Sequence, residues 1–192
     1  GLVVGSVLHL PVLIAGQRAV NKLALDAPDQ QRGGKIAGGV IGARPQQMWG
    51  CSNAQIFSEV SPDMHWEFAL KHDFPWLSRW GLTYYGCCEP LDFKLDLLRR
   101  IPNLRKISMN YRIKLTRAVQ NVADQYVFSY KPNPAVFAND NWHPGEARRE
   151  LTTVLERARG CHVELIMKDI STLRYQPQRL WEWSRIAMAL AE

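Results

Sequence analysis

Strand-like and helix-like segments alternate along most of this chain, with short connections between them. From residue 82 onward, four apolar runs typical of buried strands are each followed by a segment with apolar residues at helical spacing. The strand-like runs cover 82–87, 104–109, 125–130 and 162–167, and the helix-like runs cover 90–101, 111–123, 145–160 and 177–191. This order predicts an α/β fold in which parallel strands are joined by crossover helices.

The sequence before residue 51 has a different character. A run at helical spacing predicts a helix over 11–27, and the glycine-rich stretch after it predicts a long loop. We therefore expect 1–50 to be an N-terminal helix and loop region, and 51–192 to hold the βα units.

Between these regions, the run "AQIFSEV" (54–60) predicts one more short strand. Ser61, followed by proline and aspartate, is a typical helix start, and the helix it begins is expected to extend to about residue 80. Met64 and Phe68 are expected on the core side of this helix, and His65 at the surface or its boundary.

Charge and cysteine content narrow the classes of function. The net charge is +6 and the sequence pI is about 9.3, but the basic residues are scattered, which disfavours nucleic-acid binding and suits an anionic small molecule. Of the four cysteines, Cys87 and Cys88 are adjacent and no secretory n-region precedes them, so we expect a reduced, cytoplasmic setting. The N-terminal apolar stretch is shorter than the roughly 20 residues of a membrane span, which predicts no membrane association.

Polar or ionisable residues follow each expected strand. In a parallel α/β fold the carboxyl ends of the strands meet at one edge, and reactive groups gather there. The residues concerned are Glu59 after the first run; Cys87, Cys88 and Glu89 after the second; Asn110 after the third; Lys131 and Asn133 after the fourth; and Lys168 and Asp169 after the fifth. The pattern predicts a functional site at this edge.

Several of these residues allow more than one chemistry. Cys87 and Cys88 are either part of an open metal site, completed by Glu59 or Asp169 from other strands, or buried and inert thiols. Lys168 beside Asp169 is either a base or anion clamp, or a salt bridge that closes the last strand.

Three short motifs resemble one family. "SEVSPDMHWEF" (58–68), "YYGCCEPL" (84–91) and "IPNLRKISM" (101–109) occur in the order found in the uroporphyrinogen decarboxylase superfamily, which includes cobamide-dependent methyltransferases. The resemblance covers about 48–192. It implies a (β/α)8 TIM-barrel-like fold, of which this chain covers only about the second half. A partial barrel has open strand edges, so the chain is expected to form a homo-oligomer or to pair with a segment that completes the barrel.

The resemblance also implies a metal site, but this chain departs from the family's ligand pattern at two positions. Cys87 falls at the cysteine of a His-x-Cys zinc motif, and Tyr85 replaces the histidine. The family's second cysteine would fall near Lys168, where this chain has none. Either zinc is absent, or other residues substitute as ligands; the metal-ligand candidates are Cys87, Cys88 and Glu59, with Glu89 and Asp169 as further substitutes.

The function implied by the resemblance is transfer of a methyl group between a methylated donor, or a corrinoid carried by a partner protein, and a thiol. The expected catalytic residues are Glu89, Lys168 and Asp169, and the expected residues for binding a small-molecule substrate are Tyr85, Asn110, Lys131 and Asn133. Two alternatives remain open: metal-free decarboxylation of a carboxylated substrate, and a non-catalytic barrel fragment that binds a partner or cofactor.

Overall fold

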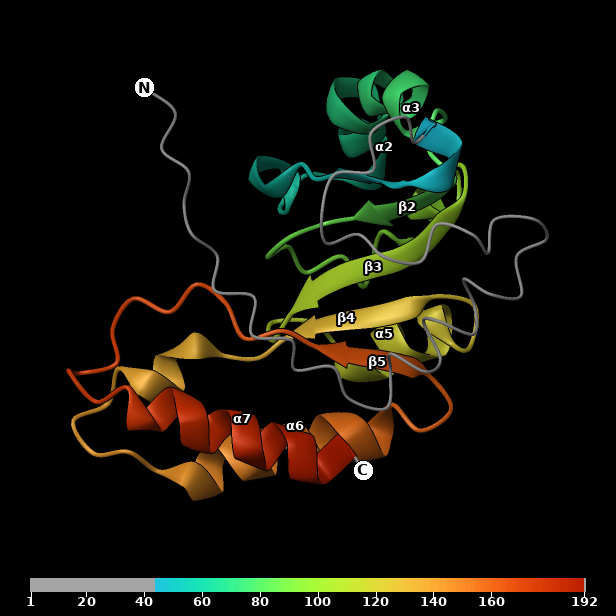
Figure 1. Cartoon of the computed structure of the whole chain (residues 1–192). Coiled ribbons are helices and arrows are strands. Elements are labelled where there is room, and N and C mark those ends of the chain that lie inside the picture. Colours follow the sequence, from blue (N-terminus) through green and yellow to red (C-terminus); the bar gives the residue numbers. More distant parts are fainter. Residues whose placement is uncertain (1–43, 192) are drawn as a thin grey trace.

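A computed structural model describes residues 44–191, which form a five-stranded parallel sheet with helices between the strands (Figure 1). The strands lie side by side in the order in which they occur in the chain. They are β1 (Trp49–Ser52), β2 (Leu82–Tyr85), β3 (Leu104–Asn110), β4 (Val127–Lys131) and β5 (His162–Leu165). The expected α/β architecture is confirmed, because every pair of neighbouring strands is parallel.

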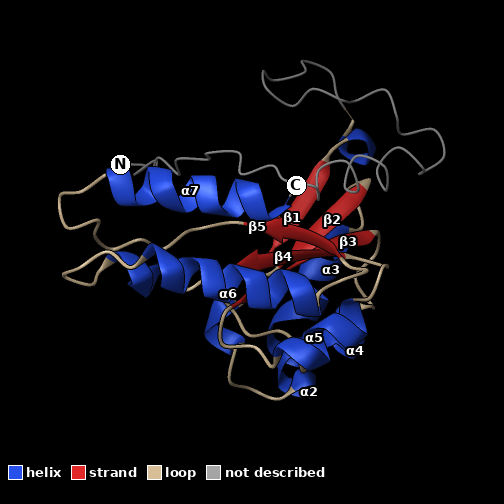
Figure 2. Cartoon of the chain, turned by 90° about the horizontal axis from the view of Figure 1, so that it is seen from below, coloured by secondary structure: helices blue, strands red, loops and turns tan. Residues whose placement is uncertain are grey.

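Helices connect the strands. The α-helices are α2 (Pro62–His65), α3 (Lys71–Leu77), α4 (Leu95–Leu98), α5 (Leu115–Val122), α6 (Pro144–Arg157) and α7 (Gln178–Ala191). Short 3-10 turns are η1 (Pro45–Gln47), η2 (Gln55–Phe57) and η4 (Pro134–Phe137), and η3 (Trp66–Leu70) is a π-helical turn that joins α2 to α3. Figure 2 shows α4, α5 and α6 on one side of the sheet, with α7 packed beside α6.

The side of the sheet that faces these helices is apolar. Successive residues of a strand point to opposite faces, so Ile107 and Met109 of β3 share a face with Phe128 and Tyr130 of β4. All four are buried in the main core together with Leu91 of the β2–α4 connection and the leucines of α4. The opposite face carries charged residues, and this difference between the two faces positions the site described below.

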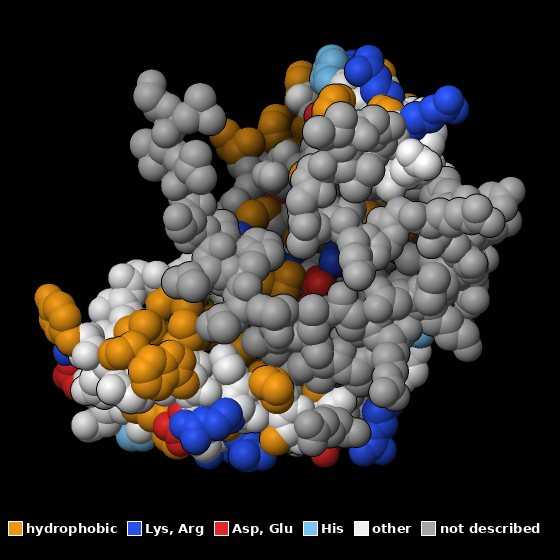
Figure 3. All heavy atoms as spheres, viewed as in Figure 1, with side chains coloured by type: hydrophobic (Ala, Val, Ile, Leu, Met, Phe, Trp, Pro, Cys, Tyr) orange, Lys and Arg blue, Asp and Glu red, His pale blue; other side chains and the backbone are white. Residues whose placement is uncertain are grey.

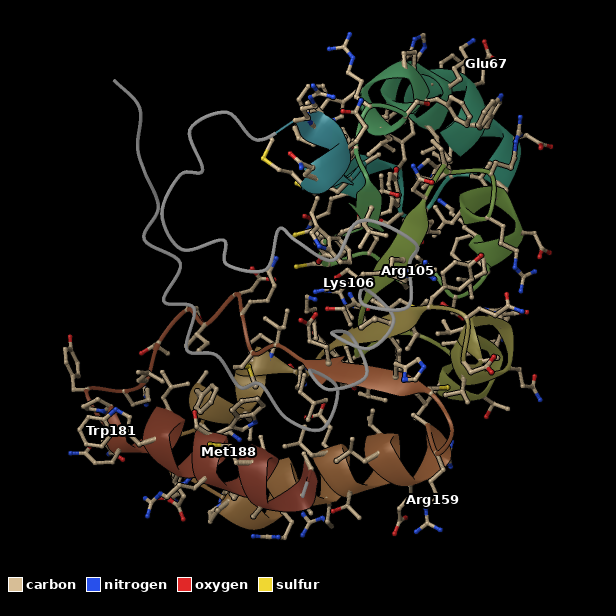
Figure 4. The ribbon with its side chains drawn as sticks, turned by 45° about the vertical axis from the view of Figure 1, so that its right-hand side comes forward. Glu67, Arg105, Lys106, Arg159, Trp181 and Met188 are labelled. Atoms are coloured by element: carbon tan, nitrogen blue, oxygen red, sulfur yellow. The ribbon has the colours of Figure 1, made fainter. Side chains whose placement is uncertain are left out.

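Exposed apolar side chains gather over α7. Trp181 and Met188 on α7 are exposed, as is Tyr175 just before it. Figure 3 shows apolar surface in its lower part, and Figure 4 labels Trp181 and Met188. Within the described range 44–191, no helix is both long enough and apolar enough to cross a membrane.

One expectation for the early part of the chain was wrong. The run 54–60 is not a strand: it contains the turn η2, and the first strand of the described residues is instead β1, which begins at Trp49. The Lys94 ammonium donates hydrogen bonds to the Phe57 and Ser58 carbonyls, which fixes this segment as a turn against the α4 region. The helix expected over 11–27 and the loop up to residue 43 lie outside the described residues.

The helix that starts at Ser61 is present, and the Ser61 hydroxyl accepts a hydrogen bond from the Met64 amide as a cap. Its faces differ from expectation. Met64 and Phe68 are exposed whereas His65 is fully buried. The His65 ring is accommodated in the interior because it has polar partners there.

Gly86 ends β2 in a conformation that only glycine adopts readily. Its φ is +99°, and a Cβ atom there would lie 2.7 Å from Leu91 Cδ1 and 2.9 Å from the Ser108 carbonyl oxygen. This turn directs the chain from the end of β2 into the two cysteines.

Replacing Gly86 with alanine should therefore destabilise the protein by about 2–4 kcal/mol, from backbone strain and overpacking together. Gly160→Ala is the matched control, because Gly160 has φ +89° but nothing within 4 Å of an added Cβ, so that only the backbone strain of about 1–2 kcal/mol remains. Urea denaturation of both variants measures the difference. Equal losses in the free energy of unfolding of the two variants would show that the close contacts at Gly86 do not affect stability.

Candidate functional site at the carboxyl ends of the strands

The carboxyl ends of β2 and β5 meet through a contact between a thiol and a lysine. Lys168 Nζ lies 2.7 Å from Cys87 Sγ, and the Asp169 carboxylate accepts a hydrogen bond from the Cys88 thiol. The two sulfur atoms are 3.8 Å apart. Four of the residues predicted for the site, from segments 81 positions apart in sequence, are thus brought together.

The loop that carries the two cysteines is held by its neighbours on all sides. The buried Glu89 carboxylate accepts from the Cys87 amide at 2.5 Å. Ser108 Oγ donates to the Cys87 carbonyl at 2.6 Å, and Asn110 Nδ2 donates to the Cys88 carbonyl at 2.5 Å. Glu89 and Asn110 therefore act on the backbone of the thiol loop, and one buried Glu89 oxygen has no partner among the described residues.

Below this loop, the charged face of the sheet carries a row of linked polar groups. Lys106 Nζ lies 2.9 Å from Glu164 Oε1, Ser129 Oγ donates to the other Glu164 oxygen at 2.6 Å, and Lys131 Nζ donates to Ser129 Oγ at 2.6 Å. Tyr84 lies beneath both amines, with its ring centre 5.6 Å from Lys106 Nζ and 5.8 Å from Lys131 Nζ. In Figure 4, Lys106 lies near the middle of the sheet.

Burial and neighbouring charges determine the ionisation of these groups. Burial lowers the pKa of Lys131 to about 8 in spite of the Glu164 charge. Burial alone would raise the pKa of Glu164, but the charge of Lys106 and the hydrogen bonds from Ser129 and Lys106 outweigh it, so the pKa is lowered. The row therefore holds a carboxylate and, at neutral pH, two amines of which one is close to losing its proton.

The thiol loop has an equally marked electrostatic pattern. Burial lowers the pKa of Lys168, but its hydrogen bonds to Cys87 and Cys88 outweigh this and raise it, so Lys168 stays protonated. Burial and the hydrogen bond to Asp169 raise the pKa of the Cys88 thiol to about 12. A protonated amine at Cys87 Sγ is the kind of partner that makes a thiol nucleophilic.

Other predicted residues lie elsewhere. Tyr85 points to the helix-covered face, where its hydroxyl is 2.7 Å from His65 Nε2, and Lys94 Nζ is 3.2 Å from His65 Nδ1. Burial and the Lys94 charge lower the pKa of His65 to about 4, so the ring is neutral. Glu59 follows η2 rather than a strand end, and its carboxylate accepts a hydrogen bond from the Ser58 hydroxyl. Asn133 caps η4 through the Ala135 amide.

Sequence reasoning missed Tyr84, Lys106 and Glu164. All three lie inside strands, and the search for polar residues considered only strand ends. The signal was present, because a charged or hydroxyl residue at every second position of a strand marks one polar face.

The distance between the two thiol sulfurs can be compared with the distance between two cysteine ligands of a zinc ion. The sulfur separation of 3.8 Å matches the roughly 3.8 Å expected for two thiolates that are each about 2.3 Å from a tetrahedral zinc. Across 44–191, however, no group of three or more His, Cys, Asp or Glu side chains is already arranged as a metal site. Cys87 and Cys88 fit two ligand positions, and Asp169 is the nearest residue for a third.

Comparison of the sequence with models of known families finds no match. The curated proteins likewise contain no significant match. The site is therefore interpreted from its own geometry.

The low pKa of Lys131 predicts a specific pH dependence of stability. A lysine whose pKa is about 8 when folded and about 10.4 when unfolded binds fewer protons in the folded state between these values, so its contribution to stability rises with pH in that window. From pH 7 to pH 9.5, the free energy of unfolding of the wild type should rise relative to Lys131→Met by on the order of 2 kcal/mol. Urea denaturation at several pH values measures this difference; parallel profiles would show that Lys131 keeps an ordinary pKa.

Proposed function

We propose that this protein is an enzyme of the uroporphyrinogen decarboxylase superfamily that transfers a methyl group to or from a thiol. The observation that carries the proposal is the contact of the Lys168 ammonium with Cys87 Sγ at the carboxyl edge of the sheet. Methyl transfer at sulfur needs a nucleophilic sulfur held in a fixed direction, and the backbone contacts of Glu89, Ser108 and Asn110 hold this loop.

The fold part of the proposal is a (β/α)8 barrel of which the described strands form a part. The sequential order of parallel strands is the order in such a barrel, and the helices α4, α5 and α6 on one side of the sheet correspond to the outer layer of helices. In 44–191 the sheet ends at β1 and β5, so both edges are free for strands of the rest of the barrel, from this chain, a second copy or a partner segment.

Zinc is the metal that this reaction would employ, with Cys87 and Cys88 as ligands and Asp169 beside them. When bound, it supplies a positive charge that keeps a coordinated sulfur deprotonated. The residues of the chain have their own tasks. Lys168 donates a hydrogen bond to the Cys87 sulfur, and Asp169 accepts one from the Cys88 thiol.

The charged face of the sheet is the proposed binding surface for the small-molecule substrate. The two amines of Lys106 and Lys131 outnumber the single carboxylate of Glu164, which suits a substrate with an acidic group. The Tyr84 ring supplies an apolar surface beside the two amines. A corrinoid-bearing partner protein would deliver or receive the methyl group at the carboxyl edge.

A second candidate function is metal-free decarboxylation, and the buried Lys131 favours it. Loss of CO2 leaves a carbanion that must be protonated, and an amine with a pKa near 8 is a suitable acid at neutral pH. In this reaction Lys106 would hold the departing carboxylate and the thiols would have no chemical step.

Zinc binding separates the two candidates. Methyl transfer predicts about one zinc per chain in equilibrium dialysis, and Cys87→Ser should weaken binding by at least tenfold, because a direct ligand is lost. Cys161→Ser is the matched control and should bind as the wild type does, since Cys161 packs against the apolar core.

The same variants should be incubated with methylcobalamin and dithiothreitol while the corrinoid spectrum is followed. Demethylation that needs Cys87 but tolerates Cys161→Ser supports methyl transfer. Absence of zinc binding together with unchanged corrinoid would contradict it and leave decarboxylation as the function to assay.

A further inference from the structure

Two free thiols in adjacent residues have hydrogen-bond partners of opposite charge. Cys87 and Cys88 are both partly exposed, and their sulfur atoms are 3.8 Å apart. One sulfur receives a hydrogen bond from an ammonium group, whereas the other donates its proton to a carboxylate. These two partners suit a reaction in which one sulfur attacks and the other loses its proton.

We propose that Cys87 and Cys88 form a reversible oxidation site, at which hydrogen peroxide converts the two thiols into a disulfide between adjacent residues. This inference goes beyond the proposed function and does not depend on it. It rests on three contacts: Lys168 with Cys87, Asp169 with Cys88, and the two sulfurs with each other.

In the first step the Cys87 thiolate attacks one oxygen of hydrogen peroxide, and the O–O bond breaks. The sulfur gains an S–O bond and becomes a sulfenic acid, while the departing hydroxide takes a proton from the Lys168 ammonium and leaves as water. Sulfur is oxidised by two electrons and peroxide is reduced by two. The 2.7 Å contact places this proton donor at the reacting sulfur.

In the second step the Cys88 sulfur attacks the Cys87 sulfenic sulfur, the S–O bond breaks, and the S–S bond forms. The Cys88 proton passes to the Asp169 carboxylate that already accepts its hydrogen bond, and the hydroxide leaves as water with that proton. The sum is two thiols and one hydrogen peroxide giving one disulfide and two waters.

The position of the two thiols predicts that the disulfide is easily reduced. Adjacent residues have Cα atoms about 3.8 Å apart across a trans peptide, which is below the usual range of about 4.4–6.8 Å for disulfides. Such bonds are strained and have more oxidising potentials, so cellular thiols can reverse them. The site therefore suits a temporary response to peroxide.

The test uses the full chain, dialysed against a chelator, reduced and then treated with hydrogen peroxide. Trypsin releases residues 80–94, which contain Cys87 and Cys88 and no other cysteine, and residues 160–168, which contain Cys161. After the remaining thiols are blocked, mass spectrometry should show peptide 80–94 lighter by two hydrogen atoms, and dithiothreitol should restore its mass. Peptide 160–168 is the internal control and should stay reduced.

Two variants assign the roles. Lys168→Gln should slow formation of the disulfide by about tenfold. Lys71→Gln is the control and should leave the rate unchanged, because Lys71 is a partly exposed lysine at the start of α3 that pairs with Glu67. Cys88→Ser should leave Cys87 to proceed to the sulfinic acid. The proposal is overturned if peptide 80–94 gains oxygen without ever forming the disulfide, or if Cys161 is oxidised as fast as Cys87 and Cys88. Both outcomes are measured on the wild type, so they decide the question even if a variant fails to fold.

Discussion

The parallel alignment of five strands in chain order is the constraint on which the site depends. Because all strands point the same way, all their carboxyl ends lie at one edge of the sheet, and the loops that follow β2 and β5 can meet there. The contact between Cys87 and Lys168 is the direct result. An antiparallel arrangement of the same segments would place these loops at opposite edges.

One face of the sheet contributes to stability, and the other carries the polar groups of the candidate site. The face under α5 and α6 is filled with apolar side chains and supplies the main core. The other face holds Lys106, Lys131 and Glu164, whose burial is unfavourable unless they are paired. Glu164 accepts from Lys106 and from Ser129, which in turn accepts from Lys131. The pairing leaves more positive than negative charge at the strand ends, which is the property an anionic substrate requires.

The later strands and helices could be predicted from the sequence because their patterns are local. β3, β4 and β5 start or end within two residues of the expected runs, and α6 and α7 cover most of theirs. The turn at 55–57 could not be predicted in the same way. Its apolar residues resemble a strand, but the contacts that fix it come from Lys94, which is 37 residues away from Phe57. Likewise His65 is buried only because Tyr85 and Lys94 provide its partners.

For the site, the sequence predicted which loops meet but not which side chains point into the same space. Tyr84 and Tyr85 are adjacent, and only the strand register decides that Tyr84 lies with Lys106 while Tyr85 lies with His65. Asn133 and Glu89 were expected to act on substrate, yet Asn133 caps a turn and Glu89 holds the Cys87 amide. Polar residues at strand ends also hold the backbone, as these two do, and only the contacts distinguish this role from ligand binding.

The central claim is that Lys168 activates the Cys87 sulfur, and the rate of alkylation of Cys87 tests it most directly. In a Cys88→Ser background, peptide 80–94 contains one thiol, so its reaction with iodoacetamide at neutral pH reports on Cys87 alone. We predict that Cys87 reacts faster than Cys161 and that adding Lys168→Met slows Cys87 by about tenfold while leaving Cys161 unchanged. A Cys87 rate that is the same with and without Lys168 would contradict the account.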